Sequence, residues 1–448
     1  MNKGFQNRSG SQEPQAPGSP PSDLLKGDGR GVGGGTVTDP PALPQNLSSP
    51  PSCVRCGACL AVCPLYRVVG RESAAARGKL NLWDAVQEGV LPAGAGLQEA
   101  LQCCLLCGAC AEKCAVGLNV PEMIKEFRAG LHREQGGLWN PALLLARLSL
   151  KAPQLLGHLA PAASLLQRLQ RWVGAESGLI YRIWPHLAAN VARLPRLARR
   201  PFRAQAPARI SGRGPLKIAF FAGCGLEAFF PQAGLAFLAI CRQREIEVII
   251  PPRQGCCGLL AEGVGDRDTA RALARRVLED FPPTVDFVVT ACASCSYQLK
   301  RLGRVLKETP EAEAAARLAA RVREASEFLV HDVGYRPEGR RPGPGRLAFH
   351  DPCHLHRGQG IIREPRELLA AAGVEVVEPK ERQCCGLGGA FGALYPELSQ
   401  HLAAARRRDF REQGAQGLVT SCSGCLIQFA HGLKARHLLE VIAPGNLF

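Results

Sequence analysis

Eight cysteines near the N-terminus stand in two runs with the same spacing. The runs are Cys53-Val-Arg-Cys56-Gly-Ala-Cys59-Leu-Ala-Val-Cys63-Pro64 and Cys104-Leu-Leu-Cys107-Gly-Ala-Cys110-Ala-Glu-Lys-Cys114. Thiolates at this spacing hold pairs of [4Fe–4S] clusters, with three close cysteines on one cluster and the fourth on the other. The spacing therefore predicts two clusters, one on Cys53, Cys56, Cys59 and Cys114 and one on Cys104, Cys107, Cys110 and Cys63.

Zinc is the alternative metal for these runs. Zinc sites pair two separated C-x2-C knuckles and do not need four cysteines at this spacing, so iron–sulfur is favoured. Small residues between the ligands, Gly57-Ala58 and Gly108-Ala109, let the backbone approach a cluster and present N–H groups to its sulfurs, which raises the reduction potential. Ala115 stands where proline usually follows the fourth cysteine, which alters the loop but removes no ligand.

Ten further cysteines form an internal repeat. Cys224, Cys256, Cys257, Cys292 and Cys295 recur as Cys353, Cys384, Cys385, Cys422 and Cys425, at offsets of 128 to 130 residues. Such constant offsets indicate two copies of one unit. Adjacent cysteines cannot easily both face one tetrahedral ion, whereas a multi-iron cluster can use both, so each set is a candidate cluster site. A redox disulfide or structural thiols remain the alternative for the doublets. Cys103 and Cys241 fall outside every set and are interpreted as buried thiols.

Short β-branched or aromatic runs end just before the cysteines of each copy. The predicted strands span 217–221, 247–250 and 286–290 in the first copy and 346–349, 374–377 and 417–420 in the second, with helical patterns such as Thr269–Phe281 and Glu397–Gln413 between them. This alternation predicts a parallel sheet with covering helices in each copy. Because ligands of open α/β sheets bind beyond the carboxyl ends of strands, five thiolates per copy are expected to converge there.

Three histidines, His350, His354 and His356, flank Cys353. Histidine beside a metal site can be a ligand or a proton relay. Asp351-Pro352 also has the pattern of a helix start after a strand, so we interpret the histidines as local caps and as groups that hydrogen-bond to the ligands, in preference to ligands themselves.

The net charge of +16 is concentrated between Lys125 and Arg213, where 15 Lys and Arg face 3 Glu. No aromatic residues are interleaved with these basic residues, and no recognisable nucleic-acid-binding module is present. A solvated or partner-docking helical linker is therefore favoured. Leu143 to Arg200 has helical spacing interrupted by prolines at 153, 161, 185 and 195, which predicts several short helices, with membrane-surface contact as the alternative role.

No signal peptide or membrane-length apolar run is present, so we expect a cytoplasmic protein. Stable disulfides are rare in the cytoplasm, so the twenty cysteines favour metal binding.

Taken together, these motifs resemble the iron–sulfur subunit family of glycolate oxidase and the related heterodisulfide reductase subunits, in which a ferredoxin-like module precedes two CCG domains. The resemblance covers roughly residues 52–448 and includes Ala76-Arg77-Gly78-Lys79-Leu80, Gly255-Cys-Cys-Gly258 and His350-Asp-Pro-Cys-His354. It implies noncubane [4Fe–4S] clusters on one or both five-cysteine sets. Members of the glycolate oxidase branch can lack some of these cysteines, whereas both sets are complete here.

The expected fold combines α+β and α/β classes: an N-terminal helical two-cluster ferredoxin-like module followed by a duplicated α/β CCG domain with parallel sheets. The expected divisions are a disordered leader at 1–51, the two-cluster module at 52–130, a basic helical linker at 131–214, and the CCG repeats at 215–330 and 331–448. The leader is rich in Gly, Pro, Ser and Gln and has few large apolar residues, so it cannot bury enough surface to order itself.

No flavin or nicotinamide fingerprint occurs in the chain, so substrate oxidation is expected on an FAD-containing dehydrogenase subunit. The resemblance implies an electron-transfer subunit of a 2-hydroxy-acid oxidase or dehydrogenase, acting on glycolate or lactate and passing electrons to an acceptor such as a quinone, with peripheral contact at the inner face of the membrane. The alternatives are a heterodisulfide reductase-like catalytic subunit and a zinc-dependent interaction protein.

Overall fold

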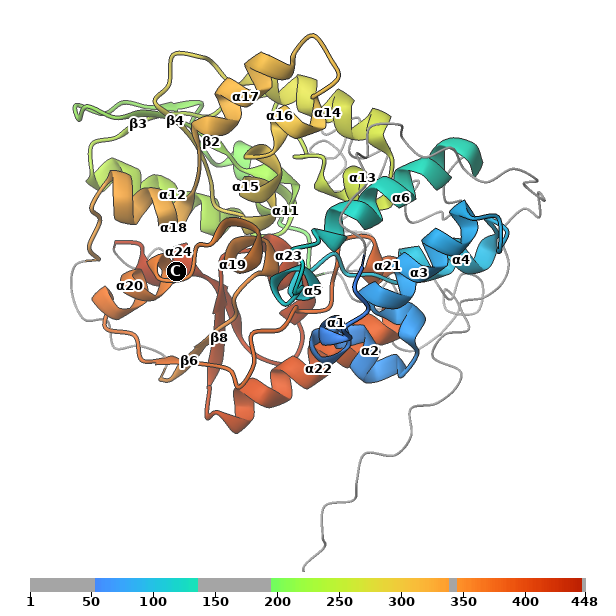
Figure 1. The fold of residues 1–448 in the computed structure, drawn as a ribbon. Coiled ribbons are helices and arrows are strands. Elements are labelled where there is room, and N and C mark those ends of the chain that lie inside the picture. The colour runs from blue at the N-terminus through green and yellow to red at the C-terminus, as the bar shows by residue number, and fades with distance from the viewer. Residues whose placement is uncertain (1–52, 136–194, 338–344, 445–448) are drawn as a thin grey trace, which may run out of the picture.

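The computed structural model of the chain describes residues 53–135, 195–337 and 345–444. The expected leader and most of the expected linker, including Pro153, Pro161 and Pro185, lie outside these ranges. The described residues form a helical N-terminal module and two α/β repeats, with the module beside both repeats (Figure 1). No helix within the described ranges is long and apolar enough to cross a membrane.

The N-terminal module is helical and has its own core. Its elements are α1 (Ala58–Val62), α2 (Pro64–Val69), the 3-10 turn η2 (Glu72–Ala74), α3 (Ala76–Gln87), α4 (Ala95–Gln102), α5 (Ala109–Glu112) and α6 (Val120–Gln135). Leu80, Trp83 and Val86 recur at helical spacing on α3 and are buried. The Trp83 ring stacks on Phe127 of α6, with ring centroids 4.0 Å apart. This packing fixes α3 against α6, which begins shortly after the second cysteine run.

The first repeat is a mostly parallel sheet covered by helices. Its elements are η3 (Phe202–Ala204), β1 (Arg209–Ile210), β2 (Lys217–Phe221), α11 (Gly223–Ala228), α12 (Pro231–Gln243), β3 (Glu247–Ile249), α13 (Leu259–Val264), α14 (Arg267–Asp280), β4 (Phe287–Thr290), α15 (Ala293–Leu299), α16 (Leu302–Val305), α17 (Ala312–Ala320), β5 (Val322–Glu324), α18 (Ala325–Glu327) and the π-helical η4 (Phe328–Asp332). The strand order is β1-β3-β2-β4-β5. In this sheet only β1, which lies in the range expected to be linker, pairs antiparallel to its neighbour β3, and the other strand pairs are parallel.

The second repeat reproduces this arrangement. Its elements are β6 (Leu347–Phe349), α19 (Cys353–Gln359), α20 (Glu364–Ala371), β7 (Val376–Val377), α21 (Phe391–Leu394), α22 (Pro396–Glu412), β8 (Gly417–Thr420), α23 (Ser423–Phe429), β9 (Ala435–His437) and α24 (Leu438–Ile442). The order β7-β6-β8-β9, with all pairs parallel, matches β3-β2-β4-β5 of the first repeat. The predicted duplication and fold class are confirmed.

One continuous core joins the two repeats. Residues 218–221 of β2 and 347–349 of β6 are buried, as expected for parallel strands covered on both faces. The Ala293 N–H donates to the Ser421 carbonyl across the repeats at 2.9 Å, and the Tyr335 hydroxyl donates to the Ile442 carbonyl at 3.0 Å. The cysteine-bearing ends of the two sheets are thereby brought face to face.

A buried ion-pair network docks the module on the first repeat. Glu122 of α6 is 5 % exposed and lies 3.0 Å from Lys125, 2.5 Å from Arg301 and 3.1 Å from Arg304. Glu262 of α13 is 3.3 Å from Lys125 and 3.6 Å from Arg301. Because buried charges are tolerated only when paired, this network holds α6 in one orientation. We refer to these five residues as the docking network.

Candidate metal centres

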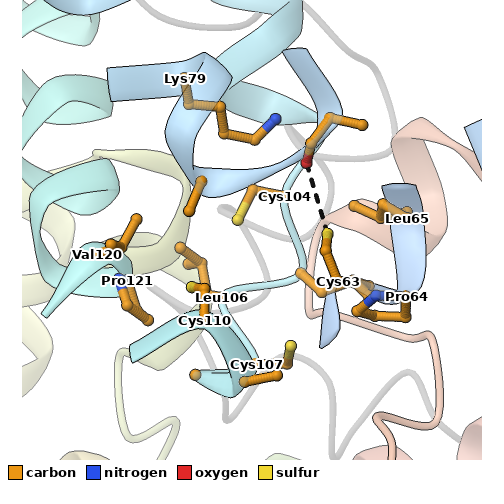
Figure 2. A pocket seen from close by; sticks show the side chains of 15 residues that line it. Cys63, Pro64, Leu65, Lys79, Cys104, Leu106, Cys107, Cys110, Val120 and Pro121 are labelled. Atoms are coloured by element: carbon orange, nitrogen blue, oxygen red, sulfur yellow. Dashed lines mark hydrogen bonds between the residues drawn. The ribbon is translucent and has the colours of Figure 1, made fainter. Parts of the chain in front are cut away.

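Four cysteines of the module line one small cavity. Cys63 caps the start of α2, Cys104 and Cys107 lie in the loop after α4, and Cys110 lies on α5. Apolar side chains such as Leu65, Leu106 and Val120 complete its wall (Figure 2). The cavity brings together the four cysteines that the spacing assigns to a single cluster.

The two cysteine runs adopt the same backbone conformation. Arg55 and Leu106 occupy equivalent positions with φ of 57° and 53°, and Gly57 and Gly108 follow with φ of 83° and 77°. The left-handed region favours glycine, which explains the Cys-Gly-Ala sequence in both runs. Each glycine begins the short helix that carries the third cysteine of its run, and the two helices, α1 and α5, pack together.

The outer set comprises Cys53, Cys56 and Cys59 in the first run and Cys114 just after α5. Cys56 is exposed, whereas the other three are half-buried. The Sγ of Cys114 accepts a hydrogen bond from the Leu118 N–H at 3.3 Å. Among the eight cysteines of the two runs, Cys56 is therefore the one that is exposed.

Arg77, Gly78 and Lys79 of α3 serve both loops. The Arg77 guanidinium donates to the Arg55 carbonyl at 3.0 Å in the outer loop. Lys79 is buried in the wall of the cavity and donates to the Ser73 carbonyl at 2.5 Å. A Cβ on Gly78 would lie 2.2 Å from the backbone oxygen of Glu72, so only glycine fits between them. In the sequence this segment indicates only the family resemblance, whereas in the structure Arg77 and Lys79 place positive charge beside the outer and the inner set.

The donors of the inner set suit an iron–sulfur cluster. All four are sulfur, which is the ligand type of iron–sulfur and zinc sites. Burial raises the pKa of Cys63 and raises that of Cys110 to about 12, so these thiols are protonated at neutral pH unless a metal displaces the protons. Cys103 is also buried, with a pKa raised by burial to about 11, and lies outside the cavity lining, as does buried Cys241. Their interpretation as buried thiols is confirmed.

The ten cysteines of the repeats form one unbroken series of thiol contacts. Each thiol influences the pKa of the next in the order Cys224, Cys256, Cys257, Cys295, Cys292, Cys422, Cys425, Cys385, Cys384 and Cys353, and the Cys425 Sγ donates a hydrogen bond to the Cys385 Sγ. Both sets lie at the carboxyl ends of their strands, where the sequence places them. All twenty cysteines are free thiols, and the Sγ atoms of Cys385 and Cys425 are 3.6 Å apart. A disulfide at either doublet is therefore absent from this structure.

The two sets meet where the repeats face each other. The Cys292 Sγ is 3.1 Å from the Ser423 hydroxyl, and the Cys422 Sγ is 3.2 Å from the Ser294 hydroxyl. Each serine lies in sequence between the two cysteines of its own Cys-x2-Cys pair and contacts the first cysteine of the pair in the other repeat. The exchange is reciprocal, as duplicated units related by pseudo-symmetry require.

Arg357 of α19 connects the module to the second repeat. Its guanidinium donates to Glu112 at 2.7 Å and to the Arg382 carbonyl at 2.6 Å. Its positive charge acts on both Cys107 and Cys353. Cys107 and Cys384 both line a pocket of about 330 Å³. The inner set of the module and the thiols of the second repeat are thus neighbours.

The three histidines near Cys353 differ in their contacts. The His354 Nδ1 lies 3.0 Å from the Ser294 hydroxyl, and its ring stacks on Tyr297 at 4.8 Å. The His356 Nε2 lies 4.0 Å from Glu112. His350 lies beside the thiols of the second repeat. Burial lowers the pKa of both His350 and His354 to about 4, so both rings are neutral at pH 7.

Comparisons with known proteins agree with this arrangement. The model of a 4Fe-4S dicluster domain matches residues 51–118, and that of a cysteine-rich domain (CCG) matches residues 218–300 and 347–430. The chain is 28 % identical over 407 residues to the probable glycolate oxidase iron-sulfur subunit of Bacillus subtilis, covering 88 % of this chain and 92 % of that protein.

Two further relatives extend the comparison. The chain is 28 % identical over 406 residues to a subunit of the fumarate reductase (CoM/CoB) of Methanothermobacter marburgensis, covering 87 % of this chain and 69 % of that protein. It is 29 % identical over 241 residues to lactate utilization protein A of Geobacillus thermodenitrificans, covering 52 % of this chain and all of that protein. The chain therefore carries a 4Fe-4S dicluster domain followed by two CCG domains, and it is similar over most of its length to the glycolate oxidase iron–sulfur subunit.

Proposed function

We propose that this chain is the electron-transferring iron–sulfur subunit of a 2-hydroxy-acid oxidase or dehydrogenase. A partner subunit carrying FAD oxidises glycolate or lactate, because this chain has no flavin or nicotinamide fingerprint. Electrons enter the N-terminal module and leave from the CCG repeats to an acceptor such as a quinone. The protein works in the cytoplasm, in peripheral contact with the inner face of the membrane.

The observation that carries this proposal is the continuity of the cysteine sets. Cys107 of the module shares a pocket with Cys384 of the second repeat, and from there the thiol contacts run through Cys422 and Cys292 into the first repeat. Isolated structural zinc sites have no need of such continuity. Closely spaced redox centres do, because single electrons must pass from one to the next.

The protein's own residues hold and tune these centres. Bound iron–sulfur clusters supply one-electron oxidation and reduction. The thiols of the four sets would fix their positions, and eight of the ten thiols of the repeats are buried, which would keep water from the centres there. Lys79, Arg77 and Arg357 place positive charge beside the module's thiols, which favours the state that has gained an electron.

The test is reduction of this chain by a flavoprotein partner. Anaerobically purified protein would be mixed with the candidate FAD subunit and glycolate or lactate, and its EPR spectrum recorded. The expected result is hydroxy-acid-dependent reduction that requires the flavoprotein and is weakened by Cys63→Ser. If dithionite reduces the chain but the substrate-reduced flavoprotein does not, the proposed electron donor is wrong.

A heterodisulfide reductase-like catalytic role is the second candidate. It is favoured by the completeness of both five-cysteine sets and by the contact of Cys292 with Cys422 at the junction of the repeats. In that role a disulfide substrate would be reduced at the repeats. Thiol-dependent EPR signals that disappear in Cys422→Ser would support it, whereas a repeat signal indifferent to thiols and disulfides would exclude it.

A further inference from the structure

His350 carries a buried nitrogen that no protein group uses. The residue directly follows β6 and is 2 % exposed. Within the part of the chain that the structure describes, its Nε2 has no hydrogen-bond partner. A ring nitrogen of His350 and the Sγ atoms of Cys385 and Cys425 all lie within 4.8 Å of one another. Because buried polar atoms in proteins are almost always satisfied by a partner, an unpartnered nitrogen beside two thiols points to a ligand that the three groups share.

Apolar rings pack against the imidazole of His350, and the charged groups Arg406 and Asp351 lie near enough to affect it electrostatically, but none of them is a hydrogen-bond partner of its Nε2. The rings of Phe410 and Phe429 pack edge-on against the imidazole, with centroids 6.1 and 5.0 Å away. Neither ring offers a hydrogen-bond acceptor in its plane. The imidazole is thus held in place by apolar packing, while a nitrogen faces the two thiols.

Another buried histidine shows what a purely structural role requires. His437 is also almost fully buried, but its Nε2 lies 2.7 Å from the Ala291 carbonyl and its Nδ1 accepts the Leu439 N–H at 3.2 Å. Both of its nitrogens are therefore satisfied by the backbone. His350 differs from it in this respect, although both residues lie at the ends of strands of the same sheet.

The first repeat has no imidazole at the equivalent place. Phe221, at the end of β2, corresponds to His350. A Cβ built on Gly223 would lie 2.9 Å from the Cys295 Sγ and 3.1 Å from the Phe221 ring, so this ring lies beside Cys295 as His350 lies beside Cys425. The two repeats present the same five cysteines but differ in this one neighbour, which makes their metal centres chemically unequal.

We propose that His350 is a nitrogen ligand of the metal cluster in the second repeat, acting together with Cys385 and Cys425. The inference rests on the proposed function, because it assumes that this repeat holds an iron–sulfur cluster. Neutral imidazole is a good ligand for iron. Histidine is a neutral ligand whereas thiolate is an anion, and iron–sulfur clusters with histidine ligands have higher reduction potentials than those held by cysteines alone. The second repeat, which adjoins the module, would then accept an electron more readily than the first.

The experiment is hyperfine spectroscopy of the anaerobically prepared full-length protein, grown with ¹⁴N- or ¹⁵N-histidine. A directly coordinated imidazole gives a strong nitrogen coupling that changes with the isotope. We expect this coupling in the wild type and in His356→Gln, and its loss in His350→Gln together with a lower midpoint potential of one cluster. His356→Gln is the matched control because it removes a neighbouring imidazole that faces Glu112.

Iron and sulfide analysis of the same sample distinguishes failure of the proposed His350 ligand from absence of a cluster in the second repeat. More than about eight irons per chain without any strong histidine coupling would overturn the role of His350 but keep the cluster in the repeats. No more than about eight irons would remove the cluster from the second repeat, and the inference with it. Because the wild-type isotope comparison needs no variant, it decides the question even if His350→Gln does not fold.

Discussion

Replacing Glu122 by glutamine should undock the N-terminal module from the first repeat. The substitution keeps the shape of the side chain and removes the negative charge that Lys125, Arg301 and Arg304 share. Removing one partner of a buried ion pair costs about 3–5 kcal/mol, because the remaining charges stay buried. Glu262 still neutralises part of the positive charge, so we expect the lower end, about 3 kcal/mol.

This loss should be visible as thermal destabilisation. In a domain of 150–250 residues a change of 1 kcal/mol shifts the Tm by about 2–4 °C, so Glu122→Gln should lower it by about 6–12 °C. The assay is thermal unfolding of the anaerobic full-length protein followed by circular dichroism. Glu313→Gln is the matched control, since Glu313 pairs with Arg317 on α17 with both side chains exposed and should change nothing measurable. Equal Tm values for the two variants would refute the docking network.

Three further predictions concern single residues. Cys63→Ser should cost the protein one cluster, or up to about four irons per chain, whereas Cys103→Ser should retain full iron content; equal losses would contradict the assignment of the inner set. Arg357→Gln should make the midpoint potentials more negative in an EPR-monitored redox titration, because a positive charge beside Cys107 is lost, and an unchanged titration would show that this charge does not reach the clusters. Burial raises the pKa of Glu324 to about 7, above the value of about 4.3 in the unfolded chain. The protein should therefore lose up to about 3 kcal/mol of stability as the pH rises from 4.5 to 7. Glu324→Gln should flatten this dependence of Tm on pH, and parallel Tm profiles for the wild type and the variant would disprove the role of Glu324.

Much of the fold could be predicted from local sequence patterns. The strand runs ahead of Cys224 and Cys422 coincide with β2 and β8, and the constant cysteine offsets correctly indicated a duplicated sheet. The short strands β1, β5 and β9 were not predicted. A two- or three-residue strand carries too little periodicity to be recognised, and its pairing depends on the neighbouring strand being present.

The membership of each cysteine set could also be inferred from spacing, but the relations between sets could not. Nothing in the sequence indicates that Cys292 meets Cys422, because this contact depends on how the two repeats pack. The same holds for Arg357, which reaches the module across a long separation in sequence. His350 shows most clearly what the sequence cannot predict. Its place beside Asp351-Pro352 and Cys353 favoured a hydrogen-bonding role, and only the structure shows that its buried Nε2 has no hydrogen-bond partner among the described residues.

The most direct test of the account is the iron and acid-labile sulfide content of the full-length protein, purified without oxygen and kept folded. We expect matching iron and sulfide in appreciable excess over about eight per chain, since the module alone would hold two four-iron clusters and the repeats provide further sets of thiols. A folded protein that contains zinc, or no metal at all, would contradict the account.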